Sequence, residues 1–299
     1  MDGFKEIRLQ DKALFDKYFF QSRYNSSEMT FTNFFMWRNF YKFRFVECEN
    51  MLCIISTPEG KAPFAFLPLG EYIPNKFRET VMFIKDYFHQ NGWELVFKRI
   101  EEENVQYFQE CTGLTSDVVF DRDSSDYVYL TEDMINLKGK KFHSKRNHIN
   151  SFHKLYKYEY VVLSEEYINE CIRINEEWCM ERDCEDHREF YCEKIANNEV
   201  LRNISTLGCK GALIKVNDRF ESYTVGEMLN EDTAVIHIEK ANSSIRGLYT
   251  VTNQLFCENQ WKNTLYINRE QDIGVEGLRK AKLSYNPVKM VNKYSVYVR

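Results

Sequence analysis

Apolar residues in the first part of the chain change their spacing several times, and each change predicts a new element. Residues 11–21 and 30–40 carry aromatic side chains at helical spacing, which predicts two helices. Short apolar runs separated by turn-forming residues predict a meander of strands at 42–48, 51–57 and 64–69. An amphipathic helix, a strand and a short helix are then predicted at 76–91, 93–98 and 102–110.

The second part of the chain repeats some of this order. Its strands are predicted at 127–130, 158–162, 205–209, 211–216, 219–228, 233–239, 265–268 and 289–297. Its helices are predicted at 140–157, 165–182, 188–197, 247–260 and 275–284. Both parts therefore place a β-meander before a strand–helix–strand crossover, an order that resembles GNAT-type acyltransferase folds.

A polar stretch at 115–126 separates the two parts and predicts a domain boundary near residue 125. A chain of 299 residues suits two domains, at roughly 100–200 residues each. The predicted fold is mixed α/β, with two tandem GNAT-like acyltransferase domains at 1–125 and 126–299. The second domain is expected to carry the active site.

Composition indicates a globular protein outside the membrane. Hydrophobic residues make up 43% of the chain, enough for packed cores. No run approaches the ~20 apolar residues that span a bilayer, and the N-terminus lacks the apolar segment of a secretory signal. We therefore expect a cytoplasmic protein. No metal site is expected, because Cys179, Cys184, His187 and Cys192 do not have the spacing of a common zinc module.

Positive charge is concentrated in one segment of this acidic chain. The formal net charge is −5, yet residues 138–157 contain seven cations and no acid. With its interleaved aromatic residues, this segment predicts contact with nucleic-acid phosphates or with anionic lipid headgroups. A solvated helix with one apolar face against the core fits the pattern equally. Lys145, Arg146 and His148 of this segment are candidate substrate-binding residues.

A second candidate site is the loop that leads into the helix predicted at 247–260. The first turn of a helix presents unpaired backbone N–H groups, which suit an anion. Arg246 adds a positive charge, and Gly247 allows close approach to the backbone. GNAT enzymes hold the coenzyme A pyrophosphate on a glycine-rich loop at this position, whereas this chain has a single glycine. A phosphate-facing loop and an ordinary helix start both remain open.

A third candidate site follows the strand predicted at 265–268. Asn268, Glu270 and Asp272 lie where ligand clefts form in α/β sheets, just past the end of a strand. On the next helix, Arg279 and Lys282 are three positions apart and share a face. Such cations can hold a phosphate or stabilise a developing oxyanion, and a carboxylate beside them can orient them or act as a base. The alternative is a solvated charge pattern that caps the helix.

The sequence from 268 to 282 resembles the C-terminal signature of phosphatidylglycerol lysyltransferases. The matching positions are Asn268, Glu270, Asp272, Gly274, Gly277, Leu278, Arg279 and Lys282. The basic stretch 138–150 is similar to the basic segment of the same family's catalytic domain. Members of that family, like the Fem peptidyltransferases, have tandem GNAT-like domains. They move an aminoacyl group from aminoacyl-tRNA to an acceptor without a dissociable cofactor.

The resemblance implies a role for each signature residue. Lys282 would stabilise the charge on the attacked ester carbonyl or contact a tRNA phosphate. Arg279 would bind the phosphate of the acceptor or of tRNA. Glu270 and Asp272 would shape the acceptor site, with Asn268 among the substrate-binding residues.

Several alternatives stay open at the level of sequence. The lysyltransferases carry a large membrane-embedded portion that this chain lacks, so a lipid acceptor and a soluble acceptor are both possible. An acyl-coenzyme A-dependent N-acyltransferase, with acyl-coenzyme A as donor, is a second hypothesis. A non-catalytic module that binds tRNA or anionic membrane through residues 138–157 is a third. The amino acid transferred and the oligomeric state are not indicated.

Overall fold

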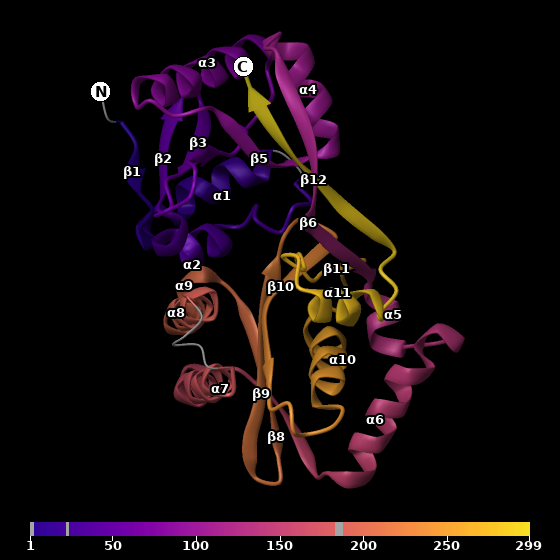
Figure 1. Cartoon of the computed structure of the whole chain (residues 1–299). Coiled ribbons are helices and arrows are strands. Elements are labelled where there is room, and N and C mark those ends of the chain that lie inside the picture. Colours follow the sequence, from indigo (N-terminus) through magenta and orange to yellow (C-terminus); the bar gives the residue numbers. More distant parts are fainter. Residues whose placement is uncertain (1–2, 22–23, 183–187) are drawn as a thin grey trace. The chain divides into compact units, whose positions relative to one another are not determined.

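The computed structural model describes residues 3–21, 24–182 and 188–299, and its fold is mixed α/β, as predicted (Figure 1). The chain divides into two compact units. Unit 1 comprises Met1–Asp126, Gln271–Glu276 and Met290–Arg299, and unit 2 comprises Tyr127–Glu270 and Gly277–Lys289. The predicted boundary near residue 125 lies next to the end of the first segment of unit 1, whereas two short C-terminal segments also belong to that unit.

The sheet of unit 1 is built from a meander and a crossover. Its strands are β1 (Lys5–Glu6), β2 (Phe43–Cys48), β3 (Met51–Ser56), β4 (Phe64–Ala65), β5 (Val96–Glu101) and β12 (Lys289–Val298). Strands β1 to β4 pair antiparallel in order, β4 pairs parallel with β5, and β5 pairs antiparallel with β12. Helix α3 (Pro74–Gln90) makes the connection from β4 to β5 that the parallel pairing requires.

Helices cover the sheet of unit 1 and bury its central strand. They are η1 (Leu9–Asp11), α1 (Lys12–Gln21), α2 (Phe31–Tyr41), α3 and α4 (Glu102–Thr112). Thr30 caps α2 by accepting a hydrogen bond from the backbone N–H of Asn33 at 3.1 Å. All six residues of β3 are buried, and Cys53 and Ile55 join Val81 of α3 in the core.

Unit 2 uses the same plan. Its strands are the second part of β6 (Ser116–Leu130), β7 (Tyr158–Val162), β8 (Lys210–Val216), β9 (Arg219–Met228), β10 (Thr233–Ala241) and β11 (Tyr266–Asn268). Strands β7 to β10 pair antiparallel in order, β10 pairs parallel with β11, and β11 pairs antiparallel with β6. Helix α10 (Leu248–Gln260) connects the two parallel strands.

The helices of unit 2 lie on both faces of this sheet (Figure 1). They are α5 (Thr131–Asn136), η2 (Lys140–Phe142), α6 (His143–Leu155), η3 (Glu165–Tyr167), α7 (Ile168–Met180), α8 (Arg188–Arg202), α9 (Ile204–Leu207), α10 and α11 (Glu276–Leu283). The strand predicted at 205–209 is wrong, because α9 occupies most of that range. The polar stretch at 115–126, in which the domain boundary was predicted, forms most of the long strand β6.

Strand β10 contains a β-bulge that shapes the candidate site. Ile236 pairs with Gly226 while Ile238 pairs with Val225, so His237 is the extra residue of the bulge. Gly226 permits this close approach, because a Cβ there would lie 2.4 Å from the backbone oxygen of Val235. A bulge redirects the side chain of its extra residue, and here that side chain is an imidazole.

Candidate functional site

The turn after β11 gathers several residues of the predicted signature in unit 2. Asn268, at the end of the strand, is buried, and its Oδ1 accepts the backbone N–H of Glu270 at 2.8 Å. The carbonyl of Glu270 accepts the N–H of Tyr127 at 3.2 Å. Glu270 has a φ of 56°, a left-handed conformation that costs free energy for a residue with a Cβ. Hydrogen bonds on both sides therefore hold Glu270 in a conformation that it would rarely adopt alone.

Lys282 supports the same turn from helix α11. Its side chain is buried, and Nζ donates to the carbonyl oxygen of Arg269 at 2.5 Å. The hydroxyl of Tyr129 donates to the carbonyl of Lys282 at 2.9 Å, which fixes the last turn of the helix. Lys282 thus holds the peptide immediately before Glu270, and three signature residues converge on one turn.

The carboxylate of Glu270 belongs to a triad with His237 and Glu227. Nδ1 of His237 lies 2.8 Å from Oε1 of Glu270, and Nε2 lies 2.9 Å from Oε1 of Glu227. The imidazole is fully buried, whereas the Glu270 and Glu227 side chains are 20% and 12% exposed. Burial alone would lower the pKa of His237, but the hydrogen bonds and charges of the two glutamates raise it to about 10. His237 is therefore an imidazolium at neutral pH, and both ring nitrogens donate.

A second polar group surrounds Arg269, the residue next to Glu270. Its largely buried guanidinium donates from Nη2 to Oε1 of Glu239 at 3.0 Å, and Oε2 of Glu239 accepts from Asn253 at 2.9 Å. The ring of Tyr285 lies under two cations, with its centroid 4.8 Å from Cζ of Arg269 and 3.8 Å from Nζ of Lys145. Burial and then the charge of Arg269 lower the pKa of Lys145 to about 8, although Glu239 partly offsets them. Lys145 can therefore exchange a proton near neutral pH.

The loop before α10 packs against α6. Gly247 has a φ of 91°, and a Cβ there would lie 2.6 Å from the backbone oxygen of His148. Arg246 is exposed. Burial, then the charge of Lys145 and last that of Arg246 lower the pKa of His148. The structure therefore accounts for the glycine by helix packing, which does not require a ligand.

The other predicted site residues have structural partners or lie elsewhere. Arg146 donates to the carbonyls of Leu137 and Gly139 and holds the loop before η2. Asp272 belongs to unit 1, where its buried carboxylate accepts from the backbone N–H of Gly274 at 2.9 Å and pairs with Arg122 at 3.3 Å. Arg279 is half-buried on α11.

Sequence patterns did not point to His237, Glu227, Arg269 or Glu239. They come from β9, β10 and the turn after β11, and only the folded sheet brings them together. The available signal was polarity, because His237 and Glu239 interrupt an apolar strand whose other residues are largely buried. A charged residue at such a position needs a partner.

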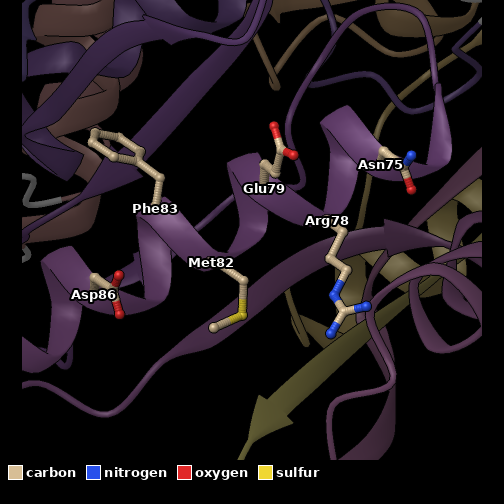
Figure 2. Close-up of a pocket in the computed structure, with 6 residues that line it drawn as sticks. All are labelled: Asn75, Arg78, Glu79, Met82, Phe83 and Asp86. Carbon is tan, nitrogen blue, oxygen red and sulfur yellow. The ribbon is translucent and has the colours of Figure 1, made fainter.

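A hollow on helix α3 of unit 1 is unrelated to these groups. Its lining residues are Asn75, Arg78, Glu79, Met82, Phe83 and Asp86, all from one helix (Figure 2). None of the predicted site residues lines it. A surface lined by one helix lacks the convergent polar groups of a binding site.

The described residues were also considered as metal ligands and as membrane-spanning helices. Within residues 3–21, 24–182 and 188–299, no group of three or more His, Cys, Asp or Glu side chains is placed to hold a metal ion. Of the cysteines and histidine considered from sequence, Cys184 and His187 lie outside the described residues. No helix among the described residues is long and apolar enough to cross a membrane.

Comparisons with known proteins agree with the resemblance. The family model described as phosphatidylglycerol lysyltransferase, C-terminal, matches residues 19–297. A conserved protein of unknown function from Bacteroides thetaiotaomicron VPI-5482 is 30% identical, with a TM-score of 0.92 over 99% of both chains. The L-PGS structure from Bacillus licheniformis is 15% identical, with a TM-score of 0.67 over 96% of this chain and 91% of that chain. The FemX structure is 7% identical, with a TM-score of 0.62 over 99% of this chain and 97% of that chain. The predicted tandem GNAT-like fold is confirmed.

Proposed function

Because the chain belongs to the phosphatidylglycerol lysyltransferase C-terminal family, we propose that it transfers an aminoacyl group from aminoacyl-tRNA to a hydroxyl or amine acceptor. One observation carries the proposal: Asn268 and Lys282 of the family signature hold the turn that presents the partly exposed carboxylate of Glu270. A carboxylate held in this way suits proton abstraction from an acceptor. The reaction needs no dissociable cofactor.

The proposed reaction is a direct acyl transfer. The acceptor oxygen or nitrogen attacks the ester carbonyl of the aminoacyl-tRNA and loses its proton to Glu270. The bond from the carbonyl carbon to the ribose oxygen of tRNA then breaks, and the proton passes to that oxygen. Orientation and electrostatic stabilisation supply the rate, without a covalent enzyme intermediate.

Cations of unit 2 have two proposed roles. Lys282, buried against the carbonyl of Arg269, positions the turn, and its predicted role in stabilising the oxyanion remains a prediction. Lys145 is the cation that changes its charge most readily, because its pKa is lowered to about 8. We propose that it binds an anionic group of a substrate, with Arg279, Arg246 and His148 as further contacts.

The basic segment 138–157, which includes α6, is the proposed contact for the tRNA phosphates. Lys140, Lys154 and Lys157 of this region are exposed, and no acid interrupts the segment. Lys138 and Lys141 pair with Glu132 and Asp133 of α5 and are less available. Anionic lipid headgroups present the same chemistry, so peripheral contact with a membrane is part of the proposal.

The test follows radiolabel from a pool of aminoacyl-tRNAs into acceptors. Purified protein is incubated with the pool and with either phosphatidylglycerol vesicles or the soluble fraction of a cell extract. We expect label in one fraction with the wild type and at least ~100-fold slower transfer with Glu270→Gln, the scale of losing a general base. Glu258→Gln, an exposed change on α10, is the matched control and should transfer at the wild-type rate.

The outcomes separate the competing functions. Label in the lipid fraction would show that the acceptor is a lipid, and label in the soluble fraction would show that it is a soluble molecule. Acetyl-coenzyme A runs in parallel, and acetyl transfer that is lost in Arg246→Glu would replace the proposal with an acyl-coenzyme A reaction. Binding of tRNA without transfer to either fraction would favour a non-catalytic module. Transfer that is unaffected by Glu270→Gln would remove Glu270 from the mechanism.

A further inference from the structure

The imidazole of His237 is placed as a bridge between two carboxylates. Its backbone lies in the β10 bulge, and its ring contacts Glu227 of β9 on one nitrogen and Glu270 on the other. The ring is fully buried, while both glutamates reach partial exposure. The backbone contacts of Glu270 fix only its main chain.

Two hydrogen bonds to carboxylates need two N–H donors. A neutral imidazole has one N–H and one acceptor nitrogen, so it satisfies a single carboxylate unless the other binds a proton. An imidazolium satisfies both and offsets one of their two charges. Glu227 therefore favours the charged imidazole by accepting a hydrogen bond from Nε2. The charged imidazole in turn donates from Nδ1 to the carboxylate of Glu270.

We infer that His237, held by Glu227, is a positioning residue that fixes the orientation of the Glu270 carboxylate toward the acceptor. The inference rests on the proposed function, because it assigns a role only if Glu270 takes the proton of the acceptor. The clamp acts on the orientation of this carboxylate and does not contact the substrate. Loss of the clamp should therefore lower kcat while KM changes little.

The first measurement needs no substrate. The protein is labelled with ¹⁵N-histidine, and the signal of His237 among the six histidines is assigned with His237→Gln. At pH 8.5 a histidine in water is neutral, whereas we expect both ring nitrogens of His237 to stay protonated, because each donates to a carboxylate. In Glu227→Gln, which keeps the shape of the side chain and removes its charge, the midpoint of the His237 titration should fall by about one pH unit or more. A neutral His237 ring at pH 8.5 in the wild type would overturn the inference.

The second measurement uses the transfer assay at pH 7. Glu227→Gln should lower kcat by about tenfold, a part of the ~100-fold or more expected for loss of the base itself, with KM within about twofold. Glu231→Gln, an exposed change in the β9–β10 turn, is the matched control and should behave as the wild type. Circular dichroism and thermal unfolding confirm that each variant folds.

Failure of the inference and failure of the proposed function look different. A wild type that transfers, a Glu270→Gln variant that does not, and a Glu227→Gln variant with the wild-type kcat would overturn the clamp alone. A wild type that transfers no aminoacyl group to any acceptor would overturn both. A Glu227→Gln variant whose KM rises with kcat unchanged would make Glu227 a binding residue and would also overturn the inference.

Discussion

At the scale of single residues, the candidate site shows how charge is kept inside unit 2. Lys282, Arg269 and His237 are buried cations, and each has an oxygen acceptor within hydrogen-bond distance. Signature residues near one another in sequence could be predicted to act together, and Asn268, Glu270 and Lys282 do share one turn. Partners from distant strands could not be predicted, because no local pattern relates Glu227 or His237 to a turn more than thirty residues later.

Lys282→Ala is predicted to impair both activity and stability. The carbonyl of Arg269 would lose its buried donor, which costs about 1–3 kcal/mol in the free energy of unfolding. The turn that carries Glu270 would loosen, and transfer should slow by about 100-fold or more. Urea unfolding and single-turnover transfer measure the two effects. Lys280→Ala, at an exposed position of the same helix, is the control, and equal behaviour of the two variants would contradict the assignment.

At the scale of elements, long amphipathic segments were predictable and polar segments were not. Helix α3 matches the predicted helix at 76–91 to within two residues at each end, because its apolar face follows helical spacing. The second part of strand β6 was predicted at 127–130, but its first part was predicted only as a polar boundary, since it is largely exposed and buries few apolar side chains. The segment 205–209 was predicted as a strand, but the single turn of α9 forms there and ends at Gly208 in a left-handed conformation.

Gly247→Ala tests how α10 is joined to α6. The substitution would force a Cβ to 2.6 Å from the backbone oxygen of His148 at a φ of 91°. Gly208→Ala is a matched control, because Gly208 also has a positive φ of 76° but has open space around it. We expect Gly208→Ala to lower the free energy of unfolding by about 1 kcal/mol from backbone strain alone, and Gly247→Ala to lower it by clearly more. If chemical denaturation shows the same loss of unfolding free energy for both variants, the contact with α6 does not contribute to stability.

Lys293→Met tests a buried ionic group that joins elements within unit 1. Nζ of Lys293 on β12 lies 2.5 Å from Glu28 and 2.6 Å from Asp126 of β6, and all three side chains are fully buried. Removing the cation takes the 2.6 Å ion pair from Asp126 and leaves Glu28 with its 3.3 Å pair to Arg99, which costs about 3–5 kcal/mol. Thermal and urea unfolding should show this loss, whereas Lys17→Met, at an exposed position of α1, should change stability little. A loss no larger than that of the control would mean that the carboxylates bind protons at little cost.

At the scale of the whole molecule, the chain combines a net negative charge with one strongly basic segment. A net charge of −5 disfavours binding of nucleic acid in general, while residues 138–157 favour it locally. The match to the family covers residues 19–297, which is most of the chain rather than one motif. Sequence alone could predict the family and the tandem fold, because the signature and the order of elements are local. It could not predict that segments near the C-terminus belong to unit 1, since that depends on long-range strand pairing.

The basic segment gives the last prediction, which concerns binding of tRNA. Each cation of residues 138–157 that contacts a phosphate should contribute about 0.7–0.9 to the slope of log K against log salt. The triple variant Lys140→Glu, Lys154→Glu, Lys157→Glu should therefore bind uncharged tRNA more weakly, with a shallower salt dependence measured by fluorescence anisotropy. The control changes three exposed lysines elsewhere, Lys5→Glu, Lys61→Glu and Lys210→Glu, and so makes the same change in net charge. If both variants lose affinity equally, net charge alone governs binding. If only the variant in residues 138–157 loses affinity, because its cations meet the phosphates directly, this basic segment is the docking surface for the donor.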